Sequence, residues 1–213
     1  MSAGSLGVIL TAEGVAGARG GRTVFEGVDL TVSAGEAVIL RGANGAGKTT
    51  LLRILAGLAK PAAGTLALEG AAINGDAPTP ATTAVFIGHL DAAKGAMTVD
   101  QNLQFWAKLY GGQASIADIK NWLFLADLSD RPAATLSAGQ RRRLGLARAL
   151  VSQRPIWLLD EPTASMDARS AARVADIIKA HCAAGGIAIV ATHEPIDLPD
   201  ARAFRMAAIG EAA

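Results

Sequence analysis

The segment with the clearest chemistry is rich in glycine and ends in one lysine and two threonines. It consists of Gly42, Ala43, Asn44, Gly45, Ala46, Gly47, Lys48, Thr49 and Thr50. The spacing matches G-x-x-x-x-G-K-[ST], a loop whose backbone N–H groups surround phosphate. In such loops the lysine reaches the β- and γ-phosphates and the Thr49 hydroxyl can bind Mg²⁺. We predict that this segment binds a nucleoside triphosphate rather than forming a glycine-rich turn without a ligand.

Two carboxylates, Asp160 and Glu161, directly follow the apolar run from Ile156 to Leu159. An isolated Asp-Glu pair usually marks a surface turn, but the carboxyl end of a buried strand is where open α/β sheets bind ligands. We expect Asp160 to hold a Mg²⁺-bound water, and Glu161 to orient or deprotonate the attacking water. The phosphate loop alone does not distinguish a kinase, a GTPase and an ATPase.

The elements that must position these residues are short apolar strands separated by helices. Strands are predicted at residues 7–10, 24–32, 37–40, 65–68, 84–87, 156–159 and 187–191. Helical spacing of apolar residues predicts helices that include Leu51 to Leu58, Leu103 to Leu109 and Val174 to Ile178. Capping patterns predict helix starts at Thr98, Ser115 and Ser137. We expect one α/β domain with a buried parallel sheet and an all-helical insertion at residues 92–151.

Composition excludes several classes of protein. Of the 213 residues, 51% are hydrophobic and 18% are charged, so the chain is not intrinsically disordered. Lys and Arg total 20 against 19 Asp and Glu, which provides no overall field that favours nucleic acid. Cys182 is the single cysteine, and we find neither a spanning apolar run nor a signal peptide. We expect a cytoplasmic protein.

A second motif, Leu136-Ser137-Ala138-Gly139-Gln140, begins a predicted helix. Ser137 is expected to cap this helix, and its hydroxyl and the Gly139 backbone would present hydrogen-bond donors to an anion. The motif resembles the LSGGQ signature of ATP-binding cassette proteins, with alanine at one glycine position. This resemblance favours an ATPase over a kinase or a GTPase.

Two groups of side chains are interpreted as having no functional role. Arg141, Arg142 and Arg143 follow the signature, and we interpret them as a solvated helix face because consecutive residues splay around a helix. His181 and Cys182 lie within a helical pattern and are interpreted as packing residues.

Five ordered motifs, which cover essentially the whole chain, resemble those of the ATP-binding cassette family. The resemblance implies a phosphate-loop NTPase domain with an antiparallel β subdomain, an α/β core at 1–91 and 152–213, and a helical subdomain at 92–151. It also implies two ATP molecules between two chains. Each ATP would contact the phosphate loop of one chain and Ser137, Gly139 and Gln140 of the other, so we expect a homodimer or a pair with a similar cassette.

The resemblance also implies roles for four further residues. Asp167 matches the D-loop that crosses to the partner chain, although it is equally suited to cap the next helix. His193 matches the switch histidine that contacts the γ-phosphate. His89 stands where the family has a glutamine linked to Mg²⁺. Arg19 stands near the position where the family usually has an aromatic residue that stacks on adenine. An imidazole can accept a water-mediated contact, and a guanidinium can stack on adenine.

Short features narrow the resemblance within the family. The segment Arg19 to Phe25, the Gly88-His89 pair, the alanine in the signature and the Thr192-His193-Glu194-Pro195 ending are similar to the haem-exporter ATPase of bacterial cytochrome c maturation. That similarity implies a Mg²⁺-dependent ATPase on the cytoplasmic face of the inner membrane. It would drive haem export or release of a haem-loaded periplasmic chaperone.

The implied partners are separately encoded membrane subunits, which we expect to contact residues 89–97. The periplasmic haem chaperone would be an indirect partner. Three alternatives remain open: a cassette for another solute such as a lipid or drug, a soluble cassette that acts on ribosomes or DNA, and a binding module without catalysis. The near-neutral charge disfavours nucleic acid as a partner.

Overall fold

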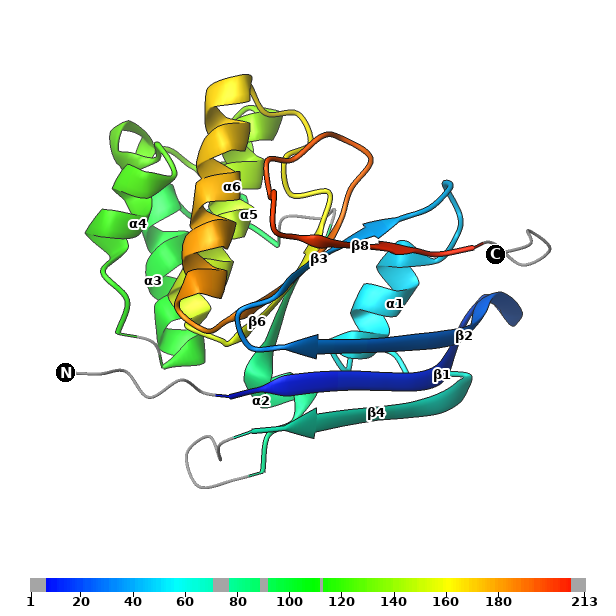
Figure 1. The fold of residues 1–213 in the computed structure, drawn as a ribbon. Helices are drawn as coiled ribbons and strands as arrows, with labels where there is room; N and C mark the ends of the chain where they lie inside the picture. Colours follow the sequence, from blue (N-terminus) through cyan, green and yellow to red (C-terminus); the bar gives the residue numbers. More distant parts are fainter. Residues whose placement is uncertain (1–6, 71–76, 89–91, 112, 208–213) are drawn as a thin grey trace.

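The computed structural model describes residues 7–70, 77–88, 92–111 and 113–207, which form two sheets with their covering helices (Figure 1). The antiparallel sheet has the order β2-β1-β4 and contains β1 (Ile9–Arg19), β2 (Arg22–Ser33) and β4 (Ala63–Glu69). The parallel sheet has the order β5-β6-β7-β3-β8. It contains β3 (Ala37–Arg41), β5 (Ala84–Ile87), β6 (Ile156–Asp160), β7 (Ile187–Ala191) and β8 (Arg202–Arg205). The predicted α/β class is confirmed.

Helices occupy both faces of the parallel sheet and the segment between β5 and β6. They are α1 (Lys48–Leu55), α2 (Pro80–Thr83), α3 (Val99–Tyr110), α4 (Ile116–Trp122), α5 (Ala138–Ser152) and α6 (Ala168–Ala183), with 3₁₀ turns η1 (Ala126–Leu128) and η2 (Ala133–Thr135). Helix α1 lies between the two sheets, whereas α5 and α6 lie on the other side of the parallel sheet (Figure 1). Among the residues described, no helix has the length and apolar character needed to cross a membrane.

Strand β6 shows why polar chemistry is confined to one edge of the parallel sheet. All its residues are buried, and successive side chains enter two different cores. Ile156 and Leu158 pack in the core that contains α1, whereas Trp157 and Leu159 pack in the core that contains α5 and α6. A strand that is apolar on both faces leaves its carboxyl end as the place for a polar side chain, and Asp160 stands there.

The helical segment has its own core, and capping fixes where its helices begin. Thr98 and Gln101 form a reciprocal capping box at the start of α3, and Ser137 and Gln140 form another at the start of α5. Ser115 caps α4 through the Asp118 N–H, without the reciprocal bond. All three predicted helix starts are confirmed.

Several predicted elements differ from the structure. The strand predicted at residues 7–10 extends to Arg19, because pairing with both β2 and β4 holds an alanine- and glycine-rich segment of weak intrinsic strand preference. Edge strand β8, with the sequence Arg-Ala-Phe-Arg, lacks an apolar pattern and was not predicted. Helix α1 ends at Leu55, so Leu58 lies outside it and is exposed.

The predicted apolar face of α3 is also partly wrong. Leu103 and Trp106 are buried, but Leu109 is 63% exposed. The two successive steps of three residues from Leu103 to Leu109 drift around a helix of 3.6 residues per turn, so Leu109 rotates out of the core.

This difference gives a stability test on one helix. Leu103→Ala should lower the free energy of unfolding by about 2–5 kcal/mol, because it removes a fully buried side chain and leaves a cavity. Leu109→Ala, the matched control, should change it by less than about 0.5 kcal/mol. Urea denaturation of both variants measures this, and equal losses would contradict the assigned orientation of α3.

Candidate functional site

The glycine-rich loop lies between β3 and α1, and its backbone requires glycine. Gly47 is the N-cap of α1 and adopts φ 89°, in the left-handed region that other residues rarely occupy. A Cβ atom at this position would also lie 2.5 Å from the Phe25 ring. Both the conformation and the close approach of Phe25 therefore exclude a side chain at the start of the helix.

One cavity of about 380 Å³ brings together most of the predicted nucleotide-binding residues. Its lining comes from the end of β1, from β2, from the loop before α1 and the first residues of α1, from the end of β6 and the residue after it, and from the segment after β7. The lining residues are Arg19, Val24, Asn44, Gly45, Gly47, Lys48, Thr49, Thr50, Asp160, Glu161 and His193. Arg19 is exposed and reaches this cavity from the end of β1. Val24 also lines this cavity, although no sequence motif marked it as a nucleotide-binding residue.

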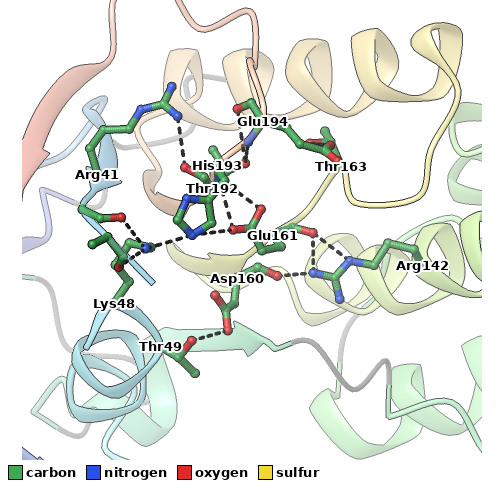
Figure 2. A network of polar contacts seen from close by, with 12 residues as sticks. Arg41, Lys48, Thr49, Arg142, Asp160, Glu161, Thr163, Thr192, His193 and Glu194 are labelled. Carbon is green, nitrogen blue, oxygen red and sulfur yellow. Dashed lines mark hydrogen bonds and ion pairs between the residues drawn. The ribbon is translucent and has the colours of Figure 1, made fainter. Parts of the chain in front are cut away.

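Lys48 lies at the centre of a polar network in this cavity (Figure 2). Its Nζ donates to the carbonyl oxygens of Gly42 at 2.8 Å and Ala43 at 3.0 Å, and lies 3.1 Å from His193 Nε2. Burial lowers the pKa of the Lys48 ammonium, while the carboxylates of Glu161 and Asp160 act in the opposite direction. Lys48 therefore places a positive charge beside the catalytic candidates at the ends of β6 and β7.

Thr49 and Asp160 form the part of the cavity best suited to a divalent cation. The Thr49 hydroxyl donates to Asp160 Oδ2 at 2.8 Å (Figure 2). Hydroxyl and carboxylate oxygens are ligands that Mg²⁺ prefers, and protein sites commonly add phosphate oxygens and water to one or two such groups. Among the described residues, no group of three His, Cys, Asp or Glu could hold a metal. His89, the third predicted metal residue, lies outside the described residues.

Glu161 is held by backbone groups of the neighbouring strand β7 and of the segment that follows it. It adopts φ 50°, and its N–H donates to the Ala191 carbonyl at 2.7 Å. Its carboxylate accepts the His193 N–H, at 3.1 Å for Oε1 and 3.3 Å for Oε2. The ring of His193 also lies near this carboxylate, with Nε2 3.9 Å from Oε1. These contacts fix the carboxylate at the mouth of the cavity without using its remaining lone pairs.

The hydrogen-bond partners assign different tautomers to His193 and His181. An ammonium has only donors, so His193 Nε2 must accept from Lys48 and the ring proton lies on Nδ1. His181 Nε2 faces the carbonyl oxygens of Pro155 at 3.1 Å and Ile187 at 3.3 Å, so it carries the proton. His181 also stacks on Trp157, and burial lowers its pKa to about 4. The interpretation of His181 and Cys182 as packing residues agrees with this geometry.

The signature residues lie outside this cavity. Ser137, Gly139 and Gln140 begin α5 and are not among the described residues that line the cavity. A Cβ atom on Gly139 would lie 2.7 Å from the Ser165 carbonyl oxygen, so the signature and the segment before Asp167 are in direct contact within one chain. Asp167 caps α6 by accepting the Ser170 N–H at 2.7 Å, and this hydrogen bond lowers the pKa of its carboxyl group.

The interpretation of the three arginines as a solvated face is wrong. Arg142 is only 4% exposed and donates to the carbonyl oxygens of Gly88, Asp160 and Glu161. Arg143 donates to the carbonyls of Leu123 and Phe124. Arg141 donates to the Leu136 carbonyl at 3.1 Å. The bonds of Arg142 and Arg143 could not be predicted from the run of like charge, because their acceptors are backbone atoms far away in the sequence.

A sequence profile of the family described as ABC transporter matches residues 25–164. The chain belongs to the ABC transporter family. It is therefore an ATP-binding cassette ATPase, and the ATPase class inferred from the signature is confirmed. The matched range runs from β2 through the loop after β6, so it includes the glycine-rich loop, the signature and both carboxylates.

Relatives of this ABC protein match it over most of its length. One is the cytochrome c biogenesis ATP-binding export protein CcmA of Rhodopseudomonas palustris (strain BisB5), 46% identical over 93% of this chain and 98% of the relative. The protein of the same name from Ruegeria pomeroyi is 50% identical over 89% of this chain and 86% of the relative. The resemblance to the ATPase of cytochrome c maturation is confirmed at the level of sequence.

Solved structures agree with the fold of an ABC cassette. A putative ABC transporter ATP-binding protein from Pyrococcus furiosus superposes with a TM-score of 0.77, at 25% identity, over 93% of this chain and 97% of that one. A dimeric ATP-binding cassette bound to ADP and Pi gives a TM-score of 0.73 at 23% identity, over 87% of this chain and 88% of that one. The second comparison concerns the fold alone.

The two tautomers can be measured directly. Long-range ¹H–¹⁵N NMR spectra should show His193 as the Nδ1–H tautomer and His181 as the Nε2–H tautomer at a pH where both rings are neutral. Lys48→Met should change the His193 signals by removing the donor to Nε2, while those of His181 stay in place. An Nε2–H signal for His193 in the unsubstituted protein would contradict the Lys48 contact.

Proposed function

We propose that the chain is the Mg²⁺-dependent ATPase subunit of a membrane complex that handles haem during cytochrome c biogenesis. The observation that carries the catalytic part is the convergence of Lys48, Glu161 and His193 beside the Thr49–Asp160 pair in one cavity. The biological part rests on the names of the relatives, which describe ATP-binding export proteins of cytochrome c biogenesis.

In this proposal the glycine-rich loop and Lys48 bind the triphosphate. The backbone N–H groups from Gly42 to Thr50 and the amino-terminal end of α1 surround the phosphates. The Lys48 ammonium exchanges its contacts with the loop carbonyls for oxygens of the β- and γ-phosphates. Arg19 and Val24 stand in the same cavity, and we assign the guanidinium to stack on adenine.

Glu161 is the proposed general base. Two of its acceptor sites take the His193 N–H, and the remaining carboxylate lone pairs can accept a proton of the water that attacks the γ-phosphate. His193 Nε2 lies 3.1 Å from Lys48 Nζ and 3.9 Å from Glu161 Oε1, so a γ-phosphate beside Lys48 would also be within reach of the imidazole. Phosphate oxygens only accept hydrogen bonds, so once Lys48 turns to the phosphate the ring proton would move to Nε2, from which His193 can donate to the γ-phosphate. The proposed division is that Lys48 and His193 orient the phosphate and Glu161 orients the water.

Thr49 and Asp160 are the proposed magnesium residues, with Asp160 acting through a bound water. Their hydroxyl and carboxylate oxygens lie within 2.8 Å of each other at the edge of the phosphate loop. A Mg²⁺ ion bound there would neutralise charge on the β- and γ-phosphate oxygens. His89 remains a proposed water-mediated contact.

The proposed active form is a homodimer. Ser137, Gly139 and Gln140 present the amino-terminal end of α5 outside their own chain's cavity, which suits them to close over ATP bound to a second chain. Asp167, next to the contact between Gly139 and Ser165, would lie near that junction. Each chain would then supply one half of two sites, as the resemblance to cassette proteins implies.

The proposed location is the cytoplasmic face of the bacterial inner membrane, where separately encoded membrane subunits bind the cassette. Of the segment expected to contact them, residues 92–97 are described and residues 89–91 are not. The haem-loaded periplasmic chaperone would be reached only through these subunits. Transport of another solute is the second candidate function, because the proposed ATP site would serve any cargo equally well.

The role of Glu161 can be tested against a neighbouring carboxylate. Glu161→Gln should bind ATP normally but lower turnover about 10²- to 10⁴-fold, because a general base is lost while the acceptor for the His193 N–H remains. An ATP-bound dimer should accumulate and be visible by size-exclusion chromatography. Glu194→Gln, a control outside the cavity lining, should keep normal turnover. Normal turnover in Glu161→Gln would remove this residue from its proposed role.

The biological assignment has a separate test. A tagged chain purified from detergent-solubilised membranes should bring down small integral membrane subunits together with a haem-binding protein. Integral subunits without haem would favour transport of another solute, whereas recovery with ribosomes would favour the soluble alternative. Each result leaves the assignment of the ATP site unaffected.

A further inference from the structure

Arg142 lies beside the backbone of Asp160 and Glu161, on the opposite side of these residues from Lys48 (Figure 2). Its guanidinium enters from α5 and is 4% exposed. Nε and Nη2 donate to the Glu161 carbonyl at 3.1 and 2.7 Å, and Nη2 also donates to the Asp160 carbonyl. Nη1 donates to the Gly88 carbonyl at 2.6 Å. One side chain therefore joins α5 to the carboxyl ends of two neighbouring strands, β5 and β6.

These bonds act on a residue whose backbone conformation is uncommon. Glu161 adopts the left-handed conformation, which is uncommon for a residue with a Cβ atom and persists only where its surroundings fix it. Its N–H is fixed by the Ala191 carbonyl, and its carbonyl is fixed by Arg142. The direction of the Glu161 side chain follows from these two peptide groups, so Arg142 helps to set where the carboxylate points.

A planar guanidinium is needed for this arrangement. Arginine presents donors in a rigid fork, and it can therefore reach the Asp160, Glu161 and Gly88 carbonyls at the same time. A lysine keeps the charge but offers one compact ammonium, which cannot span acceptors on two strands. Burial strengthens the need for an arginine here. A carbonyl that lost its charge-assisted hydrogen bond would have no water to replace the donor.

Arg154 supplies an internal comparison. It also donates to two backbone carbonyls, those of Ala81 and Ala84, but it does so at the amino end of β5. The two arginines thus share the same kind of bond at opposite ends of one strand. Loss of either should affect stability, whereas only Arg142 touches the backbone of the catalytic carboxylates.

We propose that Arg142 is a positioning residue for hydrolysis, which holds the Asp160–Glu161 backbone so that the Glu161 carboxylate faces the attacking water. This inference rests on the proposed role of Glu161 as the general base. Because it also donates to the carbonyl of Gly88, directly after the end of β5, Arg142 joins that strand to the base. It does not contact the phosphates.

The test compares Arg142→Lys with Arg154→Lys in the full-length chain, purified with the membrane subunits that accompany it. Arg142→Lys should lower kcat for ATP hydrolysis at least about tenfold, since small displacements of a catalytic group are costly, while KM for ATP stays within about twofold. Arg154→Lys should leave both constants within about twofold of the unsubstituted protein. Melting temperatures should show a loss of stability in both variants.

A double substitution separates positioning from general loosening of the fold. If Arg142 acts through Glu161, adding Arg142→Lys to Glu161→Gln should lower kcat no further than Glu161→Gln alone. Multiplicative losses, an unchanged kcat in Arg142→Lys, or equal losses in Arg142→Lys and Arg154→Lys would overturn the inference. If Arg142→Lys does not fold, Arg142→Gln replaces it in the same comparison. Absence of hydrolysis by the unsubstituted complex would instead refute the proposed function.

Discussion

Burial of the parallel sheet on both faces is the constraint on which the rest of the structure depends. Strands β6 and β7 are buried along their whole length, with alternate side chains in cores on opposite sides. Such strands cannot carry polar groups within their length, because an unpaired charge there would lose its hydration. The polar residues of the site therefore follow where these strands end, and adjacent parallel strands bring those ends to one edge.

At this edge the backbone, more than the side chains, orders the catalytic candidates. The Glu161 carboxylate accepts the His193 N–H, and the peptide groups of Glu161 bond to Ala191 and Arg142. Backbone groups that belong to buried strands move little, so they hold a carboxylate with less loss of side-chain freedom than a network of long side chains would. Lys48 then adds a positive charge to the cavity, and His193 Nε2 accepts a hydrogen bond from it.

The signature helix is tied to this edge although its first residues lie elsewhere. Within one chain, Gly139 approaches the Ser165 carbonyl, and Arg142, one turn further along α5, reaches Asp160 and Glu161. A displacement of α5 would therefore act on both the loop before Asp167 and the backbone of the proposed base. In the proposed dimer, the part of each chain that touches the partner's ATP is mechanically connected to the chain's own catalytic residues.

The sequence alone determined the local features: the glycine-rich loop, the three helix caps, the buried strands and the residues Lys48, Thr49, Asp160, Glu161 and His193 that gather in the cavity. Each is encoded within a few consecutive residues, by spacing or by an apolar run, so no distant contact is needed to see it. Tertiary structure alone decided the rest. The length of β1, the edge strand β8, the exposure of Leu109 and the burial of Arg142 depend on partners far away in the chain, and a guanidinium that bonds to carbonyl oxygens leaves no mark on the sequence of its acceptors.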